Sequence, residues 1–126
     1  MTELERLGRP PISPAQHAVL DYAVAATFCG VGFALRRRNP TAANLAFANA
    51  GMIVAMSMLT NYPGGVFRSL SFRGHRAGDM VQAVVAGAGP VLLGFGDKPE
   101  ANYFYAQALS EAGVIAATDW DAASAG

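Results

Sequence analysis

Long uncharged segments alternate along this chain with short segments that carry the charge. No Asp, Glu, Lys or Arg occurs in residues 22–35, 40–60 or 80–96, and residues 101–118 contain only Glu111. Such segments approach the roughly 20 apolar residues that a helix needs to cross the hydrocarbon core of a bilayer. The pattern therefore predicts four helices joined by polar turns.

Capping residues followed by proline mark the predicted helix starts. Ser13 precedes Pro14, with Gln16 in the position that completes a capping box, and Asn39 precedes Pro40 in the same way. Pro90 falls in the second half of the third segment, where we expect a kink. The predicted helices cover residues 14–35, 40–60, 74–95 and 97–118.

Composition separates two kinds of helical bundle. Hydrophobic residues make up 52% of the 126 residues and charged residues 14%, about half the share of an ordinary soluble domain. A soluble four-helix bundle is the alternative, and it requires a charged outer face on every helix, which the second segment lacks. We therefore predict a membrane bundle. Nine basic and nine acidic residues cancel, so no nucleic-acid partner is indicated, and the single Cys29 excludes an internal disulfide.

The chain also contains an internal repeat with an offset of 58 positions. His17-x-x-x-Asp21 recurs as His75-x-x-x-Asp79, and these are the only two histidines of the chain. The same offset relates three further pairs without a gap: Thr60 and Thr118, Asn61 and Asp119, and Tyr62 and Trp120. The repeat indicates two similar halves of two helices each.

These observations predict an all-α, integral membrane four-helix bundle with up-down-up-down topology. Two tandem two-helix repeats are related by a parallel pseudo-twofold axis along the membrane normal. We expect a polar tail at 1–12, one domain at 13–121 and a short tail at 122–126. Within the domain, repeat one is 13–62, an interfacial connector is 61–74, and repeat two is 75–120.

The repeat brings the candidate site residues to one membrane face. His17 and Asp21 are spaced i, i+4 on one side of their helix, as are His75 and Asp79, and Glu111 reaches a similar depth. We expect the two pairs to face each other, each histidine hydrogen-bonded to a carboxylate. In such a network each aspartate either fixes the histidine of its own helix or caps and joins helices. The cluster is interpreted as a structural network, with two alternatives left open. One is a proton or solute path through the carboxylates, and the other is a haem or pigment metal held by the histidines.

No metal ligand set or cofactor is predicted beyond this, and no catalytic constellation is recognisable. Tyr62 and Trp120, with Asn61 and Asp119, form a motif expected at the membrane interface, where aromatic rings favour the headgroup level. Arg68 and Arg73 are expected in the interfacial connector, with their guanidinium groups pointing outward. The fourth helix carries a polar stripe that should point into the bundle, formed by Tyr103, Gln107, Ser110 and Glu111.

The set of motifs resembles a family of small four-helix bacterial membrane proteins of uncharacterised function, similar to SPW-repeat proteins. The matching elements, over residues 12–121, are Ile12-Ser13-Pro14, His17, Asp21-Tyr22, Thr60-Asn61-Tyr62-Pro63, Arg68, Phe72-Arg73, His75, Pro90, Gly94-Phe95 and Thr118-Asp119-Trp120. Asn61 stands where the family has Asp, and the run 36–38 of three arginines is unusual. The resemblance implies a multi-pass protein of the bacterial inner membrane.

The functional expectation follows from what the chain contains. Small residues crowd the predicted helices, little of the chain lies outside them, and small side chains let helices pack closely in lipid. We expect a non-enzymatic accessory or scaffold subunit of a membrane assembly. Its partners would be lipids and either other membrane-protein subunits or further copies of itself. A proton or small-solute transporter is the alternative. Both termini are expected on the cytoplasmic side.

Overall fold

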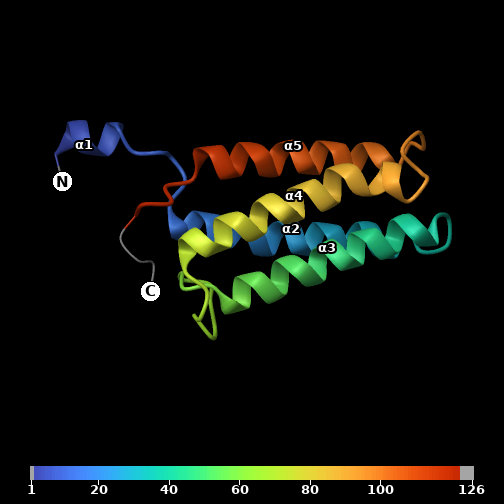
Figure 1. The fold of residues 1–126 in the computed structure, drawn as a ribbon, viewed down its shortest axis with the longest axis horizontal. Coiled ribbons are helices and arrows are strands. Elements are labelled where there is room, and N and C mark those ends of the chain that lie inside the picture. Colours follow the sequence, from blue (N-terminus) through green and yellow to red (C-terminus); the bar gives the residue numbers. More distant parts are fainter. Residues whose placement is uncertain (1, 123–126) are drawn as a thin grey trace.

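Four long helices lie side by side in the computed structural model, which describes residues 2–122 (Figure 1). Each helix runs antiparallel to the next, and both ends of the chain lie at the same end of the bundle (Figure 1). A short exposed helix, α1 (Glu3–Leu7), precedes the bundle. The long helices are α2 (Pro14–Leu35), α3 (Pro40–Leu59), α4 (Phe72–Leu92) and α5 (Ala101–Ala117). The all-helical, up-down-up-down prediction is confirmed.

The predicted starts of the first two helices are confirmed by their caps. The Ser13 hydroxyl accepts a hydrogen bond from the Gln16 backbone N–H, and the Gln16 side chain accepts one from the Ser13 N–H. The Asn39 side chain accepts from the N–H of Ala42, and Pro40 occupies the first helical position. Local capping chemistry therefore sets these boundaries.

Three boundaries differ from the prediction. α4 begins two residues early because the Ser71 hydroxyl caps it by accepting from the Gly74 N–H. α5 begins only at Ala101, since residues 97–100 form turns. Pro90 lies near the end of α4, which stops at Leu92. The end is formed by Gly94, which has a φ of 84°: the Gly94 N–H donates to the Val91 carbonyl and the Phe95 N–H to the Pro90 carbonyl. In the tail predicted at 1–12, a capping box at Thr2 starts α1.

The bundle is closed tightly on one side and loosely on the other. α3 packs against both α2 and α4, and α4 packs against α5, whereas within residues 2–122 contacts between α2 and α5 are sparse. Two glycines allow the close α3–α4 approach: a Cβ at Gly78 would lie 2.0 Å from the Met56 sulfur, and one at Gly89 would lie 2.7 Å from Leu45. A side chain at either glycine would push α4 away from α3.

The outer sides of the bundle are apolar and its charges lie at the two ends. Exposed side chains along the helices include Val19, Phe33, Val81, Val84, Val91, Leu92 and Leu109. At the end of the bundle where α2 turns into α3 and α4 into α5, Arg38 pairs with Glu100 at 3.2 Å. At the opposite end Arg9 pairs with Asp119 at 3.7 Å. α2 and α3 are long and apolar enough to cross a membrane, with mean hydropathies of 1.7 and 1.5.

Replacing Gly65 by alanine should destabilise the protein, because the new Cβ would lie 1.8 Å from the Thr60 carbonyl oxygen. Overpacking of this kind costs about 1–3 kcal/mol, and here the contact is with backbone, which cannot rotate away. Gly30→Ala and Gly51→Ala are matched controls, since an added Cβ meets nothing within 4 Å at either position. Thermal unfolding of the three variants checks this, and equal melting temperatures would contradict it.

Candidate functional site: a buried histidine and aspartate tetrad

Two histidines and two aspartates meet inside the bundle. His17 and Asp21 come from α2, and His75 and Asp79 from α4; we call these four residues the tetrad. His17 Nε2 lies 2.8 Å from an Asp79 oxygen and 3.5 Å from an Asp21 oxygen. His75 Nε2 lies 3.0 Å from an oxygen of each aspartate. Both Nε2 atoms therefore face the same two carboxylates.

The two pairs meet as predicted, and each histidine lies beside a carboxylate. The shortest contact of His17 is with Asp79 of the other half, and His75 lies equally close to Asp21 of the other half and to Asp79 of its own helix. The prediction left open whether an aspartate would fix its own histidine or join helices, and here the aspartates do both. The i, i+4 spacing places each pair on one helix face, and the crossing of α2 and α4 then decides which atoms meet.

Two threonines hold the outer nitrogens of the histidines. His17 Nδ1 lies 2.8 Å from the Thr118 hydroxyl, and His75 Nδ1 lies 2.7 Å from the Thr60 hydroxyl. Each hydroxyl also donates to the carbonyl oxygen four residues earlier in its helix, at 2.6 Å. A hydroxyl has one hydrogen, so each threonine accepts from the Nδ1–H of its histidine. Sequence reasoning found these threonines as a repeated pair and assigned them no role.

This arrangement determines what each Nε2 can do. With Nδ1–H donated to threonine, a neutral imidazole presents its Nε2 lone pair to the carboxylates. A lone pair facing a carboxylate oxygen at 3.0 Å is repulsive unless a cation lies between them. That cation is either a proton on the ring or a metal ion. The tetrad is therefore built to hold positive charge between its four side chains.

Aromatic rings cover the tetrad on the side facing the chain termini. Tyr62 is fully buried, and its hydroxyl donates to Asp21 at 2.9 Å. Burial, and after it the charge of Asp21, raises the pKa of Tyr62, so it remains a donor at neutral pH. The Trp120 ring lies 4.9 Å from the His17 ring and 4.7 Å from that of Phe72. The rings of Tyr62 and Trp120 thus pack inward over the histidines, and their position at the headgroup level of a membrane stays a prediction.

The other residues of the predicted interface lie around this cover. Asp119 is largely buried beside Arg9, and its backbone N–H donates to the Ile12 carbonyl. The backbone N–H of Asn61 donates to the Leu70 carbonyl in the corresponding way. Arg73 is exposed and pairs with Asp121 at 2.5 Å, while Arg68 is exposed with a φ of 51°. The connector arginines thus point outward, as predicted.

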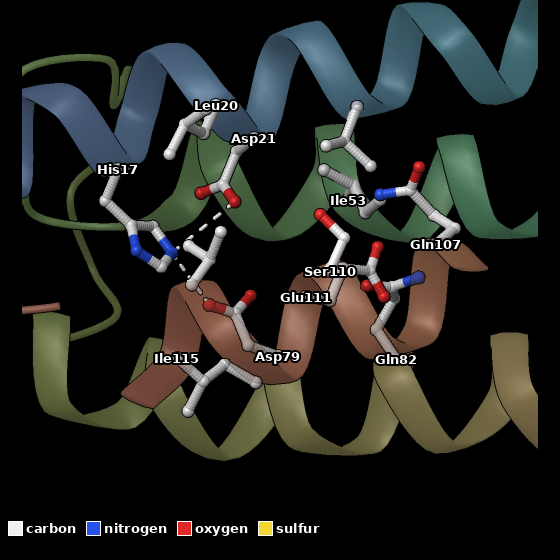
Figure 2. A pocket seen from close by; sticks show the side chains of 12 residues that line it. His17, Leu20, Asp21, Ile53, Asp79, Gln82, Gln107, Ser110, Glu111 and Ile115 are labelled. Carbon is white, nitrogen blue, oxygen red and sulfur yellow. Dashed lines mark hydrogen bonds and ion pairs between the residues drawn. The ribbon is translucent and has the colours of Figure 1, made fainter. Parts of the chain in front are cut away.

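A cavity of about 70 Å³ adjoins the tetrad between α2 and α5. Figure 2 shows His17, Asp21 and Asp79 toward one end of it and Gln82, Gln107 and Glu111 toward the other. The predicted inward direction of the polar stripe on α5 is confirmed for Gln107 and Glu111, which line the cavity, and for Tyr103, whose hydroxyl is buried. Ser110 borders the cavity but is exposed. Within residues 2–122, no group makes a hydrogen bond to either buried carboxylate oxygen of Glu111.

The geometry does not fit a haem or another large pigment between the histidines. The two ring centroids are 5.3 Å apart, and the carboxylates occupy the space that both Nε2 atoms face. Sites for drug-sized ligands are about 300–1,000 Å³, several times the volume of the adjoining cavity. The tetrad has room for protons or a single ion.

Comparisons with known protein families, with characterised proteins and with solved structures give no match to this chain.

Thr60→Val should destabilise the protein by about 1–3 kcal/mol, because it leaves the buried His75 Nδ1–H without an acceptor. Thr118→Val should have an effect of similar size through His17. Thr27→Val is the matched control, since the Thr27 hydroxyl is exposed and, among the residues described, donates only to the Ala23 carbonyl. This substitution should change the free energy of unfolding by no more than about 0.5 kcal/mol. Denaturant or thermal unfolding compares the three, and a Thr27 effect as large as the others would refute the assigned role.

Proposed function

We propose that this protein is a multi-pass membrane protein that acts as an accessory or scaffold subunit, without catalysis of its own. The observation that carries the proposal is the surface of the bundle. Its sides are exposed and apolar, while its ion pairs lie at the two ends. Such a surface is the one expected of the small four-helix bacterial inner-membrane proteins that its motifs resemble.

The two most apolar helices support this proposal through their low burial. In the apolar window of α2 only 28% of residues are buried inside the bundle, and in that of α3 only 44%. A core helix of a soluble protein is mostly buried, whereas most residues of these two windows are exposed or only partly buried. Its 22 residues give α2 a length of about 33 Å, enough for a bilayer core of about 30 Å.

α4 and α5 complete the bundle in a different way. α4 carries its polar residues in its first half, and its second half is apolar. His75, Asp79 and Gln82 are buried there, whereas Arg73 and Arg76 are exposed. α5 has 17 residues and places Glu111 on the cavity side. Both helices thus turn polar groups inward and expose residues such as Val84 and Leu109, as membrane helices do.

The absence of a reactive constellation favours an accessory role over catalysis. Several polar side chains of the interior pair with one another: the two histidines with their threonines, and Gln82 with Asn49 at 2.7 Å. The exposed apolar sides remain available for lipid, for other subunits or for further copies of the chain. Affinity purification in mild detergent followed by native mass spectrometry tests this. A single monomeric species would refute a scaffold role.

A transporter is the second candidate, favoured by Glu111. Its carboxylate is buried in the cavity beside the tetrad. If the cavity is part of a proton path, reconstituted protein should move protons across liposomes, and Glu111→Gln should abolish the flux. Proton flux equal to that of empty liposomes would exclude this candidate.

Val84→Arg separates a membrane bundle from a soluble one. Val84 is exposed near the middle of α4, where lipid would surround it. An arginine at the centre of a membrane helix costs about 2.5–3.5 kcal/mol, so the yield in the membrane fraction should fall sharply. Leu7→Arg, on exposed α1, is the control and should leave the yield unchanged. Normal expression of both variants in the soluble fraction would contradict a membrane location.

A further inference from the structure

We propose that the tetrad is a binding site for one divalent transition-metal ion, with Zn²⁺ as the best fit. The ligands would be Nε2 of His17 and His75 and one oxygen each of Asp21 and Asp79. This inference goes beyond the accessory role and does not depend on the membrane location. The bound ion would join α2 to α4 and so link the two halves of the bundle.

The donor set and its spacing suit the ion. Imidazole nitrogen and carboxylate oxygen are both Zn²⁺ ligands, and four protein ligands in a tetrahedron characterise structural zinc sites. One ligand atom from each of the four residues can be chosen so that all lie within 4.8 Å of one another. Bonds of about 2.0–2.2 Å give a tetrahedron with edges of about 3.3–3.6 Å. The nitrogen–oxygen distances of 2.8–3.5 Å in the tetrad involve both oxygens of each carboxylate. Binding through one oxygen of each therefore requires the carboxylates to rotate and the four ligand atoms, which lie within 4.8 Å of one another, to draw closer together.

A second observation points to a ligand at the same place. His75 is fully buried, and its Nε2 atom makes no hydrogen bond to any residue in the range 2–122. Yet two carboxylate oxygens lie only 3.0 Å from that nitrogen. Both oxygens are therefore close to the nitrogen without lying along its N–H direction. This geometry suits ligands arranged around a shared ion better than a donor aimed at an acceptor.

Charge balance is consistent with the same ion. Two carboxylates in a buried site carry two negative charges, and uncompensated charge there is costly. One divalent ion with two neutral imidazoles neutralises them. Two imidazolium rings would also do so, but both rings would then direct N–H groups into the same space between the carboxylates. A single ion replaces two protons and removes this crowding.

The residues around the tetrad have the roles expected of outer ligands. A histidine that binds a metal usually donates its other N–H to an oxygen, which fixes the ring and its tautomer. Thr118 and Thr60 accept in this way from His17 and His75. The Tyr62 hydroxyl donates to Asp21 and orients its carboxylate. The cavity that reaches His17, Asp21 and Asp79 provides an entry path for the ion.

Metal binding by the full-length chain tests the proposal. The protein is taken from whichever fraction holds it, membrane or soluble, so the outcome is separate from the question of location. After chelation, Co²⁺ is titrated in and followed by visible absorption. We expect about one Co²⁺ per chain with the intense d–d bands of tetrahedral coordination, displaced by Zn²⁺. Zn²⁺ should also raise the melting temperature of the chelated protein, since it binds the folded state.

Substitutions assign the site to its ligands. Asp79→Asn and His75→Gln should abolish the tetrahedral spectrum, and Thr60→Val and Thr118→Val should weaken Zn²⁺ binding by about 10–100-fold. Glu111→Gln, which changes the other carboxylate of the cavity, and Cys29→Ser should bind as the unaltered chain does. Circular dichroism verifies that each variant is folded.

Two results would overturn the proposal. One is an unaltered chain that binds no Co²⁺ and melts at the same temperature with and without Zn²⁺. The charge of the two carboxylates would then be balanced by protons on the histidines. The other is a folded Asp79→Asn variant that keeps the full spectrum. If a ligand variant does not fold, the Zn²⁺-dependent melting of the unaltered chain decides the question by itself.

Discussion

The burial of two carboxylates beside two imidazoles is the constraint on which the rest of this structure depends. Each threonine hydroxyl is committed to a helix carbonyl and to its histidine, which turns both Nε2 atoms toward Asp21 and Asp79. The negative charge there must be balanced by protons or by an ion. α2 and α4 bring the four side chains together, and the aromatic rings above them exclude water from this buried, charge-balanced group.

The two halves satisfy this constraint symmetrically but pack differently around it. Gly78 and Gly89 let α4 approach α3 closely, whereas the positions 58 residues earlier hold Leu20 and Val31. α2 and α5 make few contacts, and the cavity, which Leu20 lines, lies between them. A repeat with the same ligands in both halves therefore forms one tight helix interface and one open one.

Sequence patterns sufficed for the elements and for the members of the tetrad. Caps such as Ser13 and Asn39 are local, and the offset of 58 places both His–Asp pairs at equal depth. The contacts between histidines and aspartates of different halves were not predictable. The i, i+4 rule describes neighbours on one helix and does not give the angle at which two helices cross. The contact between Trp120 and His17 was not predictable for a related reason: the rule for aromatic rings at membrane interfaces concerns depth and does not say which side chains a ring contacts.

The contacts between the two halves also explain why neither hairpin is complete alone. His17 takes its threonine and its nearest carboxylate from the second half, and His75 takes its threonine and one of its carboxylates from the first. The isolated α2–α3 hairpin would bury a histidine without its acceptors. The hairpins form from contacts close in sequence, so they can assemble early, but the tetrad forms only when they dock. Two copies of a single hairpin would supply the same set of groups, so the tandem chain builds within one molecule a site that a symmetric dimer would build between two.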